Sequence, residues 1–190
     1  MDKELIEEKE GFKLFLVHDL DPESPREWDN LGTMVCFHRN YWLGDKNPRG
    51  ESKHNFKNNQ EFLEWWEENG NDGVILPLYL YDHSGLTMSV NEFNDRWDSG
   101  QVGWIYATKE TIIKEYGEFD KEKDEVAVYN QYLQGDVWGY IVENEDGEHL
   151  DSCWGFYGYE YAKEEGKRQL EWEVKNFHDQ EEMAKNYMAL

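Results

Sequence analysis

Residues 73–85 read GVILPLYLYDHSG, the most hydrophobic stretch of the chain, and they predict a β-strand. Pro77 lacks a backbone N–H, so this strand is expected to bulge or to lie at a sheet edge. Ser84 and Gly85 predict a turn, after which residues 86–90, LTMSV, are expected to form a second short strand. Residues 73–90 therefore predict two neighbouring strands of a sheet.

Further strands and helices are expected on both sides of this stretch, from short aromatic or β-branched runs and from helical spacing of apolar residues. The expected strands are residues 12–20, 32–39, 101–109, 135–143 and 148–156. The expected helices are residues 60–70 (capped by Asn58 or Asn59), 109–117 (capped by Thr108 and ended by Gly117), 120–134 and about 158–190. Asp146-Gly147 predicts a hairpin turn. This mixture indicates an α+β fold with a mostly antiparallel sheet, and the length favours a single domain over residues 1–190, with the C-terminal helix integral or appended.

The charge of the chain excludes several functional classes. It has 42 acidic and 19 basic residues and a net charge of −23, so direct binding to nucleic acid or to an anionic membrane is not expected. No apolar run is long enough to span a bilayer, and the N-terminal segment MDKELIEEKEGFK lacks a signal-peptide core. Two cysteines make no disulfide framework. We therefore expect a protein of the cytosol, and nine Trp, twelve Tyr and nine Phe predict a ring-rich core rather than disorder.

One group of residues could hold a metal ion or act as a catalytic centre. Asp82, His83 and Ser84 are consecutive, and His38, Asp98 and Asp136 could join them in a metal-dependent hydrolase or nuclease. None of the spacings H-x-x-x-H, H-E-x-x-H or C-x-x-C occurs. The favoured interpretation is that Asp82 and Ser84 belong to a turn, so no metal site and no cofactor is predicted.

Cys153, in the sequence DSCWG, is a second candidate, as a thiol nucleophile. The carboxylates around it would raise the pKa of its thiol and suppress the reactive thiolate. Cys153 is therefore expected to be a small buried residue without catalytic function, and Cys36 is expected to be the same.

The surplus of carboxylates is the remaining functional feature. Residues 60–69 and residues 143–151 carry acidic side chains without any Lys or Arg. A third acidic stretch covers residues 118–125. The candidate partner-binding residues are Glu61, Glu64, Glu67, Glu68, Glu143, Glu145, Asp146, Glu148 and Asp151. Like charges at this spacing cost stability, and solubility needs a net charge of only about 2–8. Such carboxylates could occupy the cationic groove of a nucleic-acid-binding protein by replacing its phosphates.

Several strings of the sequence resemble one group of small acidic reading frames found in bacteriophages, prophages and plasmids, mainly of Firmicutes. They are residues 24–39 (SPREWDNLGTMVCFHR), 76–85, 98–106, 114–117, 129–143 and 151–158. The resemblance implies a mobile-element origin and carries no catalytic or binding residue with it. Small acidic proteins of that origin are often anti-defence factors, either antirestriction DNA mimics or anti-CRISPR proteins.

The leading hypothesis is therefore a non-enzymatic inhibitor, acting in the bacterial cytosol. Its expected partner is a host defence nuclease or its guide-RNA complex, with a Cas9-type effector favoured and a restriction enzyme second. Two alternatives remain open: a metal-dependent hydrolase or nuclease using the Asp82-His83 region, and an acidic phage accessory protein with other partners.

Overall fold

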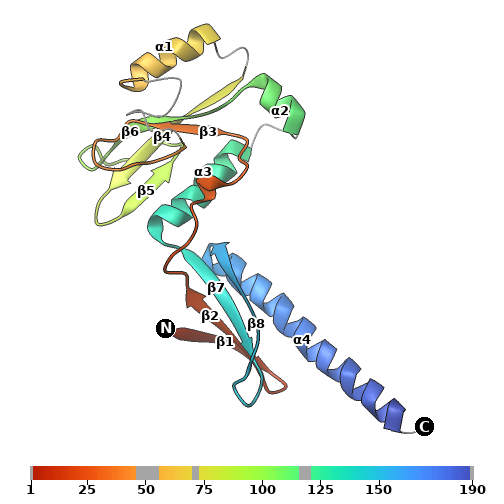
Figure 1. Ribbon diagram of the computed structural model, residues 1–190. Helices are drawn as coiled ribbons and strands as arrows, with labels where there is room; N and C mark the ends of the chain where they lie inside the picture. Colours follow the sequence, from red (N-terminus) through yellow and green to blue (C-terminus); the bar gives the residue numbers. More distant parts are fainter. Residues whose placement is uncertain (1, 46–55, 70–72, 116–120, 189–190) are drawn as a thin grey trace. The chain divides into compact units, whose positions relative to one another are not determined.

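The computed structural model describes residues 2–45, 56–69, 73–115 and 121–188, without the side chains of 115 and 121–124. The chain divides into two compact units. Unit 1 consists of residues 1–22 and 135–190, and unit 2 consists of residues 23–134. Unit 2 is therefore inserted, in sequence, between the two segments that build unit 1 (Figure 1).

Unit 1 is a four-stranded antiparallel sheet with one long helix against it (Figure 1). The strand order is β1-β2-β7-β8, made of two hairpins joined along β2 and β7. The elements are β1 (Lys3–Lys9), β2 (Phe12–His18), β7 (Val137–Glu143), β8 (His149–Tyr157) and α4 (Tyr159–Met188).

Helix α4 is anchored to the sheet through its first half only. Ala162, Gly166, Leu170 and Val174 recur at helical spacing, are buried, and pack against β2 and β7. Gly166 is needed for this close packing, because a Cβ there would come within 2.7 Å of Leu14 Cδ1. The described residues beyond Val174 are exposed except for one half-buried asparagine, and the helix continues past the sheet (Figure 1).

Unit 2 has a second antiparallel sheet, of strand order β3-β6-β4-β5, with helices on both faces (Figure 1). The strands are β3 (Thr33–Cys36), β4 (Val74–Asp82), β5 (Leu86–Ser89) and β6 (Ser99–Ala107). The helices are η1 (Pro25–Glu27), α1 (Asn59–Asn69), α2 (Lys109–Glu115) and α3 (Lys121–Gln134).

Alternation along the strands separates the two faces of this sheet. On β3, Met34 faces a core formed with Leu78, Ile105 and the α3 residues Val126 and Tyr129. The next residue along β3 belongs to the opposite face, where α1 packs and the core is largely aromatic. The buried residues of that second core are Val35, Phe62, Trp66 and Tyr106. The predicted ring-rich core is thus found on the α1 side.

The predicted α+β class, the antiparallel strand pairing and the long C-terminal helix are confirmed. For Pro77, the edge alternative holds locally, because β5 pairs with β4 only from Tyr79 to Asp82 and Pro77 is paired only with Trp104 of β6. The register of β4 with β6 shifts just after it, between Leu78 and Tyr79, but the extra residue, Val102, lies on β6. The Thr108 cap is also confirmed, since its Oγ1 accepts a hydrogen bond from Thr111 N at 3.2 Å. Gly117, expected to end that helix, lies outside the described residues.

Strand β1 was not anticipated from the sequence, because its residues KELIEEK are mostly charged. Glu10 and Gly11 explain why it forms. Their φ angles of +53° and +86° make a two-residue turn that suits a right-twisted hairpin, so β1 pairs with the apolar strand β2.

Candidate functional site

Helix α1 presents acidic side chains on the side away from the core. Asn58 is its N-cap: Glu61 N donates to Asn58 Oδ1 at 2.9 Å, and Glu61 Oε2 accepts from Lys57 N at 2.6 Å. Because Phe62 and Trp66 face the sheet, Glu64, Glu67 and Glu68 are exposed. Glu61 therefore stabilises the start of the helix, and the other three are available for a partner.

The turn between β7 and β8 is held rigidly by one asparagine. Asn144 Oδ1 accepts hydrogen bonds from Asp146 N at 3.1 Å and from Glu148 N at 2.8 Å. Gly147 has a φ of +79°, as the predicted Asp146-Gly147 turn requires. Glu145, Asp146 and Glu148 are exposed at this turn.

Two of the predicted partner-binding residues on this hairpin have partners within unit 1. Glu143 forms an ion pair with Lys3 of β1, and its side chain is only 16% exposed. Asp151 accepts a hydrogen bond from Tyr140 Oη at 3.1 Å. Burial and this bond to Asp151 raise the pKa of Tyr140. Both carboxylates thus help to hold the sheet together.

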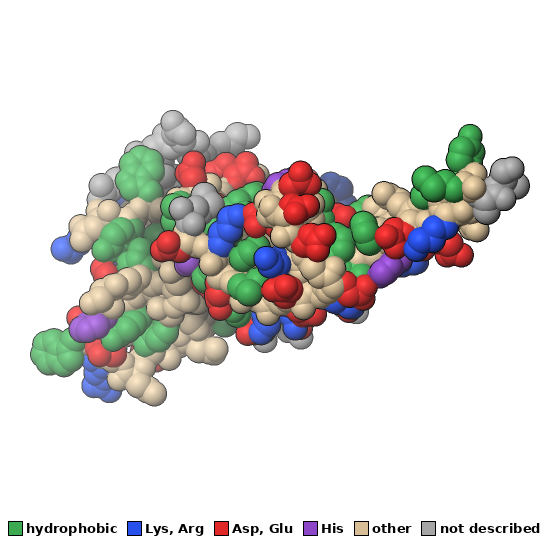
Figure 2. All heavy atoms as spheres, turned by 90° about the horizontal axis from the view of Figure 1, so that it is seen from below, with side chains coloured by type: hydrophobic (Ala, Val, Ile, Leu, Met, Phe, Trp, Pro, Cys, Tyr) green, Lys and Arg blue, Asp and Glu red, His purple; other side chains and the backbone are tan. Residues whose placement is uncertain are grey.

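Six of the nine predicted residues form what we call the exposed acidic set. The set is Glu64, Glu67 and Glu68 of unit 2 and Glu145, Asp146 and Glu148 of unit 1. Among the described residues, none of the six has a Lys or Arg within ion-pair distance. Figure 2 shows acidic side chains spread between basic and hydrophobic ones on the face drawn. The third predicted stretch, 118–125, lies outside the described side chains except for Glu125, which contacts Arg26.

The predicted metal or catalytic residues are brought together only in part. His83 Nδ1 lies 2.7 Å from Asp98 Oδ2, so these two do meet. Asp136 belongs to unit 1, where its Oδ1 accepts hydrogen bonds from Trp138 Nε1 at 2.7 Å and from Tyr159 N at 3.2 Å. In the described ranges, no three His, Cys, Asp or Glu side chains are grouped so that they could hold a metal ion.

Residues 83–85 form the turn that the sequence favoured, but Asp82, which was expected to belong to it, is the last residue of β4 and pairs with Leu86. Ser84 has a φ of +59°, and His83 N donates to Gly85 O at 3.2 Å between the paired strands β4 and β5. Asp82 interacts outside the turn: its hydrogen bond with Tyr41, and then its charge, raise the pKa of the Tyr41 hydroxyl. The Asp82 carboxylate therefore interacts with the hydroxyl of an aromatic side chain, Tyr41.

The burial expected for Cys153 is wrong, because its side chain is exposed. It lies on β8, an edge strand whose pairing with β7 is irregular between Trp138 and Tyr140. Trp154, the next residue, is exposed too and lies against Gly139, so the regular inward–outward alternation is lost here. The burial expected for Cys36 is confirmed.

The two thiols are expected to differ sharply in reactivity toward Ellman's reagent at pH 8. Burial, followed by the charge of Asp45, raises the pKa of Cys36 to about 12, so this thiol stays protonated and shielded. Native protein should release one equivalent of chromophore, from Cys153, and unfolded protein should release two. Cys153→Ser should remove the native signal; if it does not, the exposure of the two thiols has been assigned the wrong way round.

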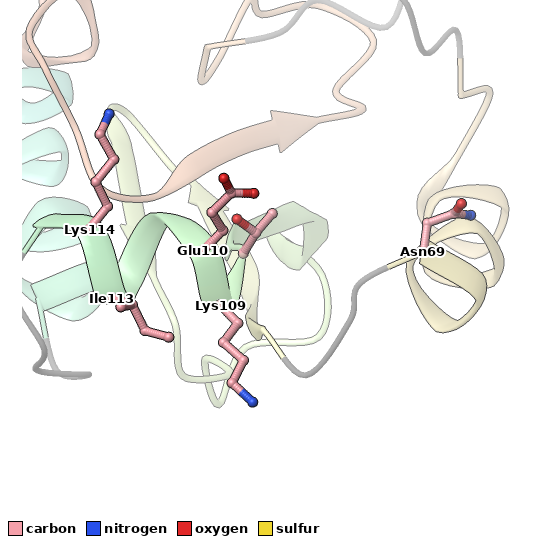
Figure 3. A pocket seen from close by; sticks show the side chains of 6 residues that line it. Asn69, Lys109, Glu110, Ile113 and Lys114 are labelled. Atoms are coloured by element: carbon pink, nitrogen blue, oxygen red, sulfur yellow. The ribbon is translucent and has the colours of Figure 1, made fainter.

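A cavity of about 660 Å³ lies between the end of α1 and helix α2, lined by Asn69, Thr108, Lys109, Glu110, Ile113 and Lys114. Figure 3 shows Lys109 and Lys114 pointing in opposite directions from α2, with Asn69 across the gap. The Thr108 hydroxyl lies 2.8 Å from that of Thr111. Among these six residues, no nucleophile is paired with a base.

Sequence reasoning missed the most exposed aromatic residues of unit 2. Trp42 is 79% exposed and Trp97 is 95% exposed. Each lies in a segment of turn-forming and charged residues, HRNYWLGD and NDRWDSG. A large ring in such a segment belongs to no helical or strand stripe, and that signal could have identified both residues as surface groups.

Comparison of the chain with known protein families, curated proteins and solved structures finds no match to any of them. Within the described residues, no helix combines the length and the apolar character that crossing a membrane requires.

Proposed function

We propose that this protein is a non-enzymatic inhibitor that places exposed carboxylates, those of α1 in unit 2 or those of the β7–β8 turn in unit 1, in the cationic, nucleic-acid-binding groove of another protein. The single observation that carries the proposal is that these six carboxylates are exposed on firmly built elements and lack cationic partners among the described residues. A capped helix and a hydrogen-bonded turn present the charges with little loss of conformational freedom on binding.

The charge surplus is present in both units. Unit 1 has 21 acidic and 8 basic residues, and unit 2 has 21 acidic and 11 basic residues. On α1, Glu64, Glu67 and Glu68 lie within about 6 Å of helix rise. Duplex DNA carries one charge per about 1.7 Å of its axis, so this local density approaches that of the polymer such a groove accepts. Binding should be fast and sensitive to salt.

The first targets to test follow from the resemblance to mobile-element proteins. A Cas9-type effector with its guide RNA is the first, and a restriction enzyme is the second. Either has a groove for a polyphosphate chain that carboxylates could occupy in competition with DNA.

The test measures affinity for such an enzyme from 50 to 300 mM salt, for the wild type and two triple variants. One variant is Glu64→Gln/Glu67→Gln/Glu68→Gln and the other is Glu145→Gln/Asp146→Asn/Glu148→Gln. If each lost contact is worth about 0.2–1 kcal/mol, a triple variant should bind roughly tenfold more weakly. Its affinity should also fall less steeply with salt.

The matched control is Glu171→Gln/Asp179→Asn/Glu182→Gln, which removes three exposed acids of α4 and changes the net charge equally. Its affinity for the enzyme should stay within about twofold of that of the wild type if the position of the carboxylates matters. Equal losses in all three variants would mean that only net charge acts. Absence of binding to both enzyme classes would refute the proposed target.

A further inference from the structure

Two loops of unit 2 each carry a tryptophan whose indole ring is exposed to solvent. Trp97 is 95% exposed, which is the highest value for any large hydrophobic side chain in the described ranges, and Trp42 is 79% exposed. An indole is costly to leave in water, and Trp is the residue type most enriched at binding hot spots.

The loop that carries Trp97 is fixed by Asp95. Its Oδ1 accepts hydrogen bonds from Trp97 N at 2.8 Å and from Asp98 N at 3.0 Å, and its backbone oxygen accepts one from Ser99 Oγ. These backbone bonds, ahead of the charge of His83, lower the pKa of Asp95. The loop is therefore held by these hydrogen bonds, while the Trp97 ring is almost fully exposed.

The loop that carries Trp42 is fixed by His38. Its Nδ1 accepts hydrogen bonds from Asn40 N and Tyr41 N, both at 3.3 Å, and its ring stacks on Tyr41 at 4.9 Å. This second loop is thus also supported by local contacts, while the Trp42 ring remains exposed.

Asp82 at the end of β4 joins the two loops. Its backbone N donates to Asp98 O at 2.8 Å, next to Trp97, and its carboxylate is near enough to Tyr41, next to Trp42, to raise the pKa of that hydroxyl. Both loops also meet the same end of the sheet, since Phe37 N donates to Val102 O at 2.7 Å and Ser99 pairs with Tyr81. The Asp98 carboxylate contacts His83, whose ring stacks on Tyr81. Two exposed indoles and two carboxylates consequently lie at one end of the sheet of unit 2.

We infer that this aromatic–carboxylate platform (Tyr41, Trp42, Asp82, His83, Trp97 and Asp98) is a docking surface for arginine side chains of a protein partner. A guanidinium can stack on an indole and donate two hydrogen bonds to a carboxylate, which a lysine ammonium cannot do with the same geometry. The inference does not require the nucleic-acid-mimic function.

Charge complementarity selects this occupant over others. Phosphate-bearing ligands are opposed by Asp82, Asp95 and Asp98 and by the surplus of ten negative charges in unit 2. A wholly apolar partner would bury Asp82 and Asp98 without a cation. Two arginines, Arg39 and Arg96, lie in these loops against four carboxylates, Asp82, Glu92, Asp95 and Asp98, so a surplus of two negative charges remains there.

The test is an NMR titration of the full chain with two blocked peptides, Gly-Arg-Gly-Arg-Gly and its lysine counterpart. The indole N–H signals of Trp42 and Trp97, assigned with single Trp→Phe variants, should shift with the arginine peptide. The lysine peptide should bind several-fold more weakly.

Trp42→Ala/Trp97→Ala should weaken arginine-peptide binding about fivefold or more, and Asp98→Asn about threefold. Trp172→Ala removes an exposed indole of α4 and should leave the affinity within twofold. Glu145→Gln/Asp146→Asn/Glu148→Gln should leave the Trp42 and Trp97 shifts intact, which separates this surface from the exposed acidic set. Equal affinity for both peptides, or an equal loss in Trp172→Ala, would overturn the inference.

Discussion

Replacing Arg26 with alanine is expected to lower the free energy of unfolding of unit 2 by about 3–5 kcal/mol. The Arg26 side chain is only 4% exposed and lies between two carboxylates. Its Nε and Nη2 each donate to Asp45 at 2.6 Å, and its Nη1 donates to Glu125 at 2.9 Å. Its Nη2 also donates to Gly32 O at 2.6 Å.

The effect should be large because the two carboxylates are themselves fixed by backbone groups. Glu125 accepts from Leu31 N at 2.7 Å, and Asp45 accepts from Met34 N at 2.9 Å. Burial works against the Arg26 charge, but the bonds to Asp45 and Glu125 outweigh it and raise the pKa of the guanidinium. Without Arg26, the Asp45 and Glu125 carboxylates, whose side chains are 21% and 15% exposed, would lose the cation that they share.

Urea unfolding followed by far-UV circular dichroism measures this loss. Arg96→Ala is the matched control, since Arg96 is an exposed arginine of the same unit, and it should change stability by no more than about 0.5 kcal/mol. A loss below about 1 kcal/mol for Arg26→Ala would show that the cluster is not a structural centre of unit 2.

Replacing Leu170 with alanine is expected to destabilise unit 1 by about 2–5 kcal/mol. Leu170 is fully buried in the core that α4 forms with β2 and β7. Truncation leaves a cavity, and Leu14 and Tyr140 of the sheet can only partly fill it. Because α4 is buried only from Ala162 to Val174, few other contacts can compensate.

Leu20→Ala makes the same chemical change at a leucine of unit 1 that is 81% exposed, and it should cost less than about 0.5 kcal/mol. Thermal unfolding followed by circular dichroism compares the two variants. Similar losses at both positions would mean that α4 does not depend on this core.

The sequence predicted the local structure of most segments because the relevant signals are local. Alternation and β-branched or aromatic runs located β2, β4 and β7, and Asp146-Gly147 located the β7–β8 turn. The division at Pro22 and Gly135 left no such signal, because no Pro-, Gly- or Ser-rich linker marks it. Strand β1 could not be predicted because its residues are mostly charged. It forms through pairing with β2 rather than through its own β-propensity.

The sequence predicted the candidate site less completely, because its nine carboxylates differ only in their distant partners. Lys3 and Glu143 are 140 positions apart, yet β1 and β7 place them in one ion pair. In the same way, Tyr140 of β7 donates a hydrogen bond to Asp151 of β8. No spacing rule connects such residues, so the division between structural and exposed acids could not be read from the chain.

The sequence by itself determined the charge of the protein, its α+β class, its long C-terminal helix and the turns that Gly, Asn and Asp impose. These features follow from composition and from periods of two to four residues, which are properties of neighbouring positions. Only the tertiary structure decided that Cys153 faces solvent and that Arg26 is buried among carboxylates. Burial depends on which distant strands and helices pack together, and that is fixed by the fold as a whole.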